Sequence, residues 1–325
     1  MTANLLEVNN LKTYFFTRGG VVKAVDDVSF VMRPGETLGV VGESGCGKSV
    51  TALSIMRLIA SPPGKIVDGE INFDGENILE KNQHEMTDLR GSKISMIFQD
   101  PMTSLNPVFT VGYQIAETVK RHRRSLSNDQ AWKRAVEMLD LVHISDAKQR
   151  AKNYPHEFSG GMRQRVMIAI ALACNPQLLI ADEPTTALDV TIQAQVLELI
   201  KGLSKEFGAA VMLITHDLGV VAGTCQWVNV MYAGRVVESA PVKQIFETPA
   251  YPYTVGLLQS IPRLNEARGS RLTPIAGQPP DLAHPPAGCP YAPRCPKVQS
   301  RCRQERPELM PVGRGEQVAA CFYPN

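Results

Sequence analysis

Short apolar runs alternate with amphipathic stretches along residues 1–240, and this alternation predicts an α/β domain. The strand candidates are short and rich in Val, Ile and Leu. They are residues 6–15, 37–41, 95–99, 177–181, 210–216 and 227–234. Between residues 110 and 172 the apolar positions follow helical spacing instead. We therefore expect a helical insert within a mixed α/β domain.

The pattern changes near residue 240. Residues 274–296 carry eight prolines, and no long regular helix tolerates that density. We predict a domain over residues 1–240, with a helical subdomain at about residues 105–172. Residues 241–325 then form an irregular extension rich in Cys and Pro.

Composition narrows the class of protein. The chain has 325 residues, of which 44% are hydrophobic and 20% charged, which allows a sizeable core. A net charge of +2 gives no strong field for nucleic acid. No apolar run is long enough to cross a membrane, and the first ten residues lack the features of a secretory signal. We expect a cytoplasmic protein.

Residues 42–49 read GESGCGKS and fit the phosphate-binding pattern G-x-x-x-x-G-K-[ST]. They follow the strand candidate 37–41 and precede a helical pattern at 50–60. Glycines let successive N–H groups point at an anion, and the helix adds its positive N-terminal end. Lys48 can reach the β- and γ-phosphates, and Ser49 can ligate Mg²⁺. The residues expected to bind ATP here are Gly42, Glu43, Ser44, Gly45, Cys46, Gly47, Lys48, Ser49 and Val50.

A second group of candidate residues lies at the end of another apolar strand. Residues 178–181 are apolar, and Asp182 follows at the carboxyl end, where sites form in α/β sheets. Asp182 would contact Mg²⁺ through water. Glu183 would polarise the attacking water as a general base or positioning group.

Residues 158–165, FSGGMRQR, precede that strand. Ser159, Gly160 and Gly161 offer a hydroxyl and close backbone N–H groups to an anion. Together with the two earlier motifs, this segment resembles the LSGGQ signature of ATP-binding-cassette (ABC) ATPases. Phe158 replaces the family's Leu, and Met162 replaces its Gln. The resemblance covers about residues 4–265 and implies a cassette with a RecA-like phosphate-loop core, an antiparallel β subdomain and a helical subdomain.

The resemblance assigns further roles. Gln99 matches the glutamine that reaches the metal and the attacking water. His216 matches the switch histidine on the γ-phosphate. Asp189, which follows Ala187 and Leu188, matches the residue that crosses to the opposite subunit.

Near the N-terminus, Phe15 stands where the family has an aromatic residue that stacks on adenine. Tyr14 and Phe16 are its neighbours.

The family's mechanism implies a dimer. Two cassettes pack head to tail, so that each ATP lies between one phosphate loop and the other subunit's signature residues Ser159, Gly160, Gly161 and Met162. A second, homologous ATPase subunit is therefore expected, in a heterodimer or a homodimer.

Four of the seven cysteines crowd the extension, spaced Cys289-x5-Cys295-x6-Cys302-x18-Cys321. Disulfides are disfavoured in a reducing cytosol. Structural zinc prefers Cys pairs separated by two to four residues, and these spacings are longer. Four thiolates on proline-stiffened loops can instead enclose a [4Fe–4S] cluster. Zinc and free or paired thiols remain alternatives.

Two segments of the extension resemble one subfamily. Residues 287–309 and residues 247–262 are similar to the C-terminal region of oligopeptide and dipeptide importer ATPases. Some members carry a [4Fe–4S] cluster there, and the resemblance implies the same cofactor on the four cysteines, with a structural or regulatory role.

The resemblance implies an ATP hydrolase held peripherally on the cytoplasmic face of the plasma (inner) membrane. Its partners would be two transmembrane permeases and an extracytoplasmic binding protein, with residues 100–107 and the insert at about 110–160 as the docking surface. The implied cargo is dipeptides or oligopeptides, and nickel or another small solute remains an alternative. A soluble ABC ATPase acting on nucleic acid is disfavoured, because the chain has one cassette, no long coiled-coil insertion and little net charge.

Overall fold

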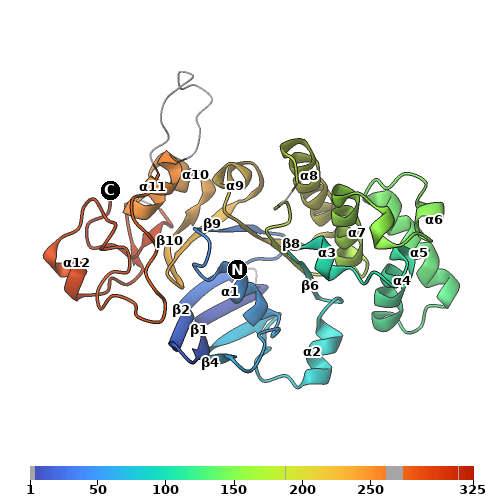
Figure 1. The fold of residues 1–325 in the computed structure, drawn as a ribbon, viewed down its shortest axis with the longest axis horizontal. Coiled ribbons are helices and arrows are strands. Elements are labelled where there is room, and N and C mark those ends of the chain that lie inside the picture. The colour runs from blue at the N-terminus through green and yellow to red at the C-terminus, as the bar shows by residue number, and fades with distance from the viewer. Residues whose placement is uncertain (1–3, 187, 261–273, 314) are drawn as a thin grey trace. The chain divides into compact units, whose positions relative to one another are not determined.

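The computed structural model describes residues 4–186, 188–260, 274–313 and 315–325. The chain forms two compact units. Figure 1 labels their helices and strands. The first unit contains Met1–Met32, Thr37–Leu79 and Thr215–Asn325. The second contains Arg33–Glu36 and Glu80–Ile214. The C-terminal extension thus belongs to the same unit as the N-terminal strands, and a domain boundary near residue 240 stays a prediction.

The first unit begins with an antiparallel sheet of strand order β2-β1-β4-β5. Its register pairs Leu6 with Met32 on one side and with Phe73 on the other. Alternate side chains of β1, such as Leu6, Val8 and Leu11, are fully buried, as expected for a sheet with one covered face. The strands are β1 (Leu6–Thr17), β2 (Gly20–Met32), β4 (Gly64–Phe73) and β5 (Glu76–Asn77).

A second group of strands in this unit has the order β11-β12-β10-β9-β3. β3 and β9 are parallel, whereas β10 and the two short C-terminal strands add antiparallel pairs. These strands are β3 (Thr37–Val41), β9 (Trp227–Tyr232), β10 (Arg235–Pro241), β11 (Met310–Pro311) and β12 (Val318–Ala319). The helices are α1 (Lys48–Ile55), α9 (Leu218–Thr224), α10 (Val242–Glu247), α11 (Pro252–Gln259) and α12 (Ser300–Gln304).

The second unit contains parallel strands in the order β8-β7-β6 and a set of helices. The strands are β6 (Ile94–Ile97), β7 (Leu178–Asp182) and β8 (Ala210–Thr215), whose last residue is counted in the first unit. All five residues of β7 are buried, and the first four are apolar, as expected for a strand covered on both faces. The helices are α2 (Gln83–Leu89), α3 (Pro101–Ser104), α4 (Val111–His122), α5 (Asn128–Leu141), α6 (Ala147–Arg150), the 3-10 helix η1 (Pro155–Glu157), α7 (Gly160–Leu172) and α8 (Val190–Phe207).

The predicted α/β class is confirmed, α4, α5 and α7 lie within the residues expected to form the helical insert, and the strand at 37–41 has the predicted ends. The predictions for β1, β6, β7, β8 and β9 differ from the structure only at their ends. β2, β4 and β10 were missed. Polar residues interrupt each of these strands, so they lack the continuous apolar runs on which the predictions relied.

The extension contains little regular structure in its proline-rich part. Residues 274–299 form turns and irregular segments, and α12 follows them. In the part of the chain that the structure describes, no helix is both long and apolar enough to cross a bilayer. Residues 261–262, the end of the importer-type segment 247–262, lie outside the described residues.

One buried carboxylate joins the extension to the sheet. Glu238 on β10 is 0% exposed. It accepts hydrogen bonds from the backbone N–H groups of Ala250 and Tyr251 at 2.7 and 2.9 Å, and from the Gln317 amide at 2.7 Å. A buried carboxylate is tolerated only when its oxygens are satisfied in this way. Glu238 therefore fixes where α11 begins and where the chain returns towards β12.

Replacing this acid tests that role. In Glu238→Ala three buried donors lose their acceptor, and we expect the free energy of unfolding to fall by about 3 kcal/mol. Urea unfolding followed by circular dichroism measures the change. The matched control is Glu247→Ala, which removes an exposed acid on α10 and should leave the unfolding midpoint unchanged. Equal midpoints for Glu238→Ala and the wild type would contradict the anchoring role.

Candidate functional site

The predicted phosphate loop connects the end of β3 to the start of α1. A side chain at Gly47, where φ is 103°, would place its Cβ 2.3 Å from the Ala24 carbonyl oxygen. A Cβ on Gly42 would lie 2.3 Å from the Met231 carbonyl oxygen. Both positions therefore require glycine, because the loop backbone lies directly against β2 and β9.

Lys48 occupies this loop as the sequence predicted. Its side chain is buried, and Nζ donates to the carbonyl oxygens of Gly42 and Glu43 at 2.8 and 3.0 Å. The ammonium group is thereby held over the glycine backbone, beside the N–H groups at the start of α1. Such a concavity of N–H groups and one cation binds phosphate oxygens.

Cys46 plays a different part in the loop. Burial raises the pKa of its thiol, although the neighbouring Lys48 ammonium acts in the opposite direction. Cys46 is thus a neutral thiol that packs inside the protein. Ser44 and Gly45, in contrast, are exposed to solvent.

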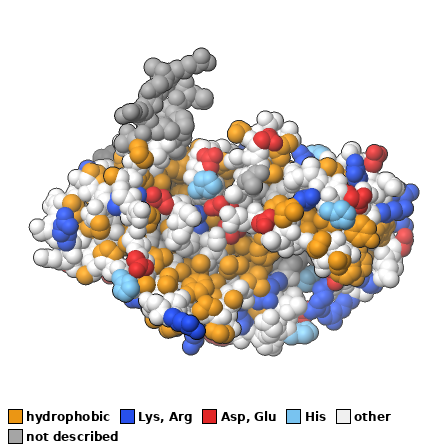
Figure 2. Space-filling model, viewed as in Figure 1, with side chains coloured by type: hydrophobic (Ala, Val, Ile, Leu, Met, Phe, Trp, Pro, Cys, Tyr) orange, Lys and Arg blue, Asp and Glu red, His pale blue; other side chains and the backbone are white. Residues whose placement is uncertain are grey.

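The aromatic residues of β1 differ in their surroundings. The Tyr14 hydroxyl donates to Asp26 Oδ1 at 2.7 Å, and burial raises the pKa of Tyr14 to about 12. Phe15 is half-buried, whereas Phe16 is 52% exposed. Figure 2 shows hydrophobic side chains gathered over β1, β2 and β4. Adenine stacking on Phe15 stays a prediction, and Phe16 offers a more exposed ring.

In the second unit the structure brings Gln99 and Glu183 together. Gln99 Nε2 donates to Glu183 Oε2 at 3.1 Å, and Thr186 Oγ1 donates to the same oxygen at 2.9 Å. Asp182, the last residue of β7, is buried and 5% exposed. Two consecutive carboxylates thus stand at the carboxyl end of a buried parallel strand, as predicted.

The backbone at Glu183 is strained. Its φ of 45° lies in the left-handed region, which is costly for a residue with a Cβ. The Glu183 N–H nevertheless donates to the Ile214 carbonyl oxygen at 2.9 Å, so the strand pairing holds this conformation. Strain of this kind is concentrated at functional sites, where it fixes the direction of one side chain.

Ser159 and Asp189 both lie at the N-termini of helices. Ser159 Oγ accepts from the Met162 N–H at 3.4 Å as the N-cap of α7, with Gly160 exposed beside it. Asp189 Oδ1 accepts from the Ile192 N–H at 3.0 Å as the N-cap of α8. Ala187 lies outside the described residues. The contacts of Ser159 and Asp189 with a second subunit stay predictions.

The predicted ATP residues are divided between the two units. The first unit holds the phosphate loop with Ser49 and Val50, together with Phe15 and the exposed His216 that follows β8. The second unit holds Gln99, Asp182 and Glu183. The assigned roles of these residues stay predictions.

The four cysteines of the extension, although scattered in sequence, line one cavity of ≈ 20 Å³ together with Tyr251 and Tyr291. The Tyr251 hydroxyl lies 3.3 Å from Cys289 Sγ, and the Tyr323 N–H donates to Cys321 Sγ at 3.4 Å. Every cysteine of the chain is described and is a free thiol.

The cavity has room for about one water molecule. Among the described residues, no three His, Cys, Asp or Glu side chains are arranged around a single metal ion. A mononuclear zinc site would bring its sulfurs to about 3.8 Å from one another, given Zn–S bonds of about 2.3 Å. The donor set of four thiols nevertheless fits a [4Fe–4S] cluster, in which each thiolate binds a different iron.

One residue of this region was missed by sequence reasoning. Arg294, which precedes Cys295, forms an ion pair with Glu43 of the phosphate loop at 2.6 Å. No motif marks Arg294, and only a three-dimensional structure can reveal a pair between such distant positions.

Known proteins resemble the chain along nearly its whole length. A family profile described as "ABC transporter" matches residues 25–186, and one described as "Oligopeptide/dipeptide transporter, C-terminal region" matches residues 237–302. A probable peptide ABC transporter ATP-binding protein of Sinorhizobium fredii is 56% identical over 99% of this chain and 95% of its own length. An oligopeptide transport ATP-binding protein of Salmonella typhimurium is 52% identical, with 98% and 94% covered.

A solved structure also resembles the fold. A dimeric ATP-binding cassette in a post-hydrolysis state, bound to ADP and Pi, aligns with a TM-score of 0.66 and 28% identity. The alignment covers 73% of this chain and 98% of that one.

The position of Lys48 leads to a direct test. Lys48→Ala removes the only side-chain cation of the loop, and we expect the dissociation constant of the full chain for ATP·Mg²⁺ to rise about tenfold to a hundredfold. Isothermal titration calorimetry measures it. Lys243→Ala, which removes an exposed lysine of α10, should bind like the wild type. Unchanged affinity in Lys48→Ala would show that the loop does not bind the phosphates.

Proposed function

The chain belongs to the ATP-binding subunits of ABC transporters, and on this premise we propose that it hydrolyses ATP to power the uptake of dipeptides or oligopeptides. The peptide cargo is supported by the names of its relatives and by the match of its C-terminal region. The observation that supports the use of ATP is the arrangement of Lys48 within the glycine loop.

The first unit supplies the residues that bind the nucleotide. Lys48 and backbone N–H groups of the loop that follow Glu43 neutralise the phosphate oxygens, and an aromatic ring of β1 covers adenine. Ser49, Gln99 and Asp182 are the residues that would hold Mg²⁺, which when bound neutralises charge on the β- and γ-phosphates. His216 contacts the γ-phosphate.

The second unit supplies the residues that direct water. Both hydrogen bonds from Gln99 and Thr186 go to Glu183 Oε2, so they fix the plane of the carboxylate. A carboxylate held in this way orients a water molecule for in-line attack and accepts its proton. The strained backbone of Glu183 adds to this fixed direction.

A complete site requires a second subunit. Ser159, Gly160 and Met162 would contact the ATP bound by the partner, because the N-terminus of α7 presents N–H groups to an anion. The dimeric form of the similar cassette supports this arrangement. The second subunit is a homologous ATPase or another copy of this chain, and Asp189 would lie at their interface.

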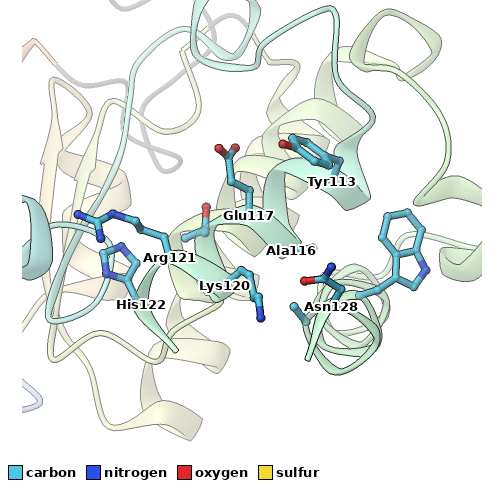
Figure 3. Close-up of a pocket in the computed structure, with 10 residues that line it drawn as sticks. Tyr113, Ala116, Glu117, Lys120, Arg121, His122 and Asn128 are labelled. Carbon is cyan, nitrogen blue, oxygen red and sulfur yellow. The ribbon is translucent and has the colours of Figure 1, made fainter. Parts of the chain in front are cut away.

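The surface of the helical insert suits membrane partners. Met102, Val108, Phe109 and Tyr113 are 42–69% exposed, and the rings of Phe109 and Tyr113 stack at 4.9 Å. Tyr113 also lines a hollow of ≈ 700 Å³ on α4 and α5, where Glu117, Lys120 and Arg121 add charged groups (Figure 3). Exposed apolar side chains of this kind are typical of a protein-binding surface.

We propose that two transmembrane permeases dock at this surface. The subunit is then held peripherally on the cytoplasmic face of the inner membrane, and an extracytoplasmic binding protein delivers the peptide to the permeases.

We also propose that the four extension thiols hold a [4Fe–4S] cluster. The donor set and the hydrogen bonds at Cys289 and Cys321 support this, since such bonds stabilise cluster sulfurs. The lining side chains must move apart to admit the cluster. When bound, the cluster links the irregular loops of the extension, which is a structural role.

Glu183→Gln tests the catalytic assignment in the assembled transporter. The amide keeps the hydrogen-bonding shape but loses the base, so we expect ATP hydrolysis to fall at least about a hundredfold while ATP binding persists. Phosphate release and ATP-driven uptake of a labelled dipeptide into vesicles measure the effect. Glu206→Gln, at an exposed position of α8, is the matched control. Wild-type turnover in Glu183→Gln would refute the role, and uptake of Ni²⁺ instead of peptide by the wild type would refute the cargo.

Cys302→Ser tests the cluster. Anaerobically purified wild type should contain about four iron and four sulfide per chain with a broad absorption near 400 nm. The variant should lose most of both. Cys174→Ser, at a buried cysteine of the second unit, should retain them. Stoichiometric zinc, or no metal in the wild type, would contradict the proposal.

A further inference from the structure

The phosphate loop is paired with the extension through a buried arginine. Arg294 donates from both terminal nitrogens to the Glu43 carboxylate, at 2.6 and 2.9 Å. The Arg294 side chain is 3% exposed and that of Glu43 is 29% exposed. Paired hydrogen bonds of this kind fix orientation as well as distance. Glu43 is the second residue of the loop, so its position affects the direction of the N–H groups that follow.

Arg294 is itself held in place by the extension and by β9. Its Nε donates to the Ala276 carbonyl oxygen at 2.9 Å, and a terminal nitrogen donates to the Tyr232 hydroxyl at 3.3 Å. The guanidinium also lies over the rings of Tyr232 and Tyr291, 5.8 and 5.9 Å from their centroids. These contacts leave the arginine few alternative positions.

A second residue of the C-terminal region binds the loop backbone. The hydroxyl of Tyr253 on α11 accepts a hydrogen bond from the Glu43 N–H at 2.8 Å. Tyr253 is fully buried, and its ring packs on Tyr232 at 4.6 Å. Both the backbone and the side chain of Glu43 are therefore positioned by residues that follow β10.

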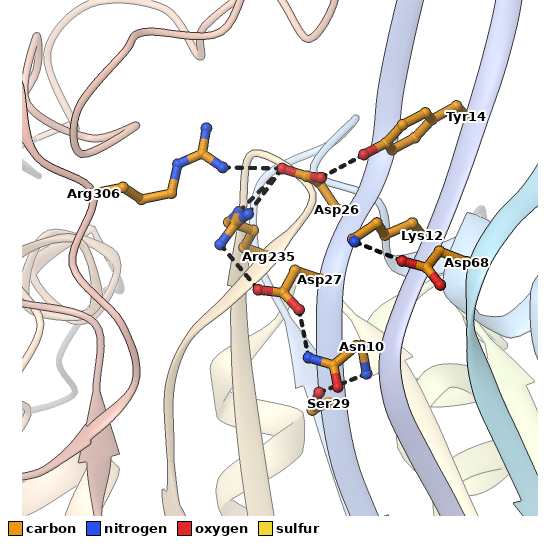
Figure 4. Close-up of polar contacts among 9 residues, drawn as sticks. All are labelled: Asn10, Lys12, Tyr14, Asp26, Asp27, Ser29, Asp68, Arg235 and Arg306. Carbon is orange, nitrogen blue, oxygen red and sulfur yellow. Dashed lines mark hydrogen bonds and ion pairs between the residues drawn. The ribbon is translucent and has the colours of Figure 1, made fainter.

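A third contact reaches the strands next to the proposed adenine site (Figure 4). Arg306 donates to Asp26 Oδ2 at 3.1 Å, and Arg235 donates to the same oxygen at 3.0 Å. The Tyr14 hydroxyl donates to the other oxygen. Asp26 thus connects the extension to β1, where Phe15 lies.

We propose that the extension positions the nucleotide half-site and that Arg294 is a positioning residue for ATP binding. This inference rests on the proposed ATP-binding function. The Glu43 carboxylate stands beside the site of the triphosphate and would repel it, and Arg294 neutralises that charge while holding the loop. Arg306 acts in the same way on the strands that flank adenine.

The test is a titration of the full-length chain with a fluorescent ATP analogue in the presence of Mg²⁺. Arg294→Met keeps most of the side-chain volume but leaves the Glu43 charge unpaired, and we expect about tenfold weaker binding. Arg294→Lys keeps the charge and should lose less. Arg294→Met combined with Glu43→Gln removes both charges and should recover most of the affinity. In the assembled transporter, Arg294→Met should raise KM with kcat within about twofold.

Two further variants distinguish a failure of this inference from a failure of the proposed ATP site. Arg301→Met removes an exposed arginine of the same extension, paired with Glu305, and should bind like the wild type. Wild-type affinity in Arg294→Met, or an equal loss in Arg301→Met, would overturn the inference. If Lys48→Ala also bound like the wild type, the ATP site itself would be wrong. Should Arg294→Met fail to fold, Arg294→Lys decides, and an affinity equal to the wild type would overturn the inference.

Discussion

The close approach of the phosphate loop to two neighbouring strands is the constraint on which the site depends. A Cβ on Gly42 or Gly47 would lie 2.3 Å from a carbonyl oxygen of β9 or β2. The loop can therefore take its shape only if both positions are glycine and both strands are in place. Lys48 then folds back over the loop, and the anion site forms from backbone N–H groups and one ammonium. Residues from distant parts of the sequence thus shape an apparently local motif.

The two units carry side chains suited to different parts of the proposed reaction, and the fold of each unit explains which. The first unit offers N–H groups, a cation and aromatic rings, which suit binding of a nucleotide. The second unit offers carboxylates at the end of a buried strand, which suit orientation of water and metal. Gln99 and Thr186 bind one oxygen of Glu183, and its left-handed backbone directs the side chain. The proposed hydrolysis draws on both sets of residues.

Sequence reasoning predicted the local positions of the candidate residues that short segments mark, and their roles stay predictions. The phosphate loop, Asp182 with Glu183, and Ser159 were all recognisable, because each depends on a fixed spacing next to an apolar strand or a helix. It missed β2, β4 and β10, whose polar residues hide their strand pattern. It also missed Arg294, because the pair with Glu43 joins positions 251 residues apart. Such contacts depend on the packing of the whole unit, which no local pattern encodes.

If this chain uses ATP to move peptide, phosphate release and peptide uptake must be coupled. Phosphate release is followed in vesicles that contain the two permeases, the paired ATPases and the binding protein, with and without peptide. We expect peptide to accelerate phosphate release and to accumulate inside the vesicles only while ATP is hydrolysed. Phosphate release that is absent, or that proceeds at the same rate without peptide, would contradict this coupling.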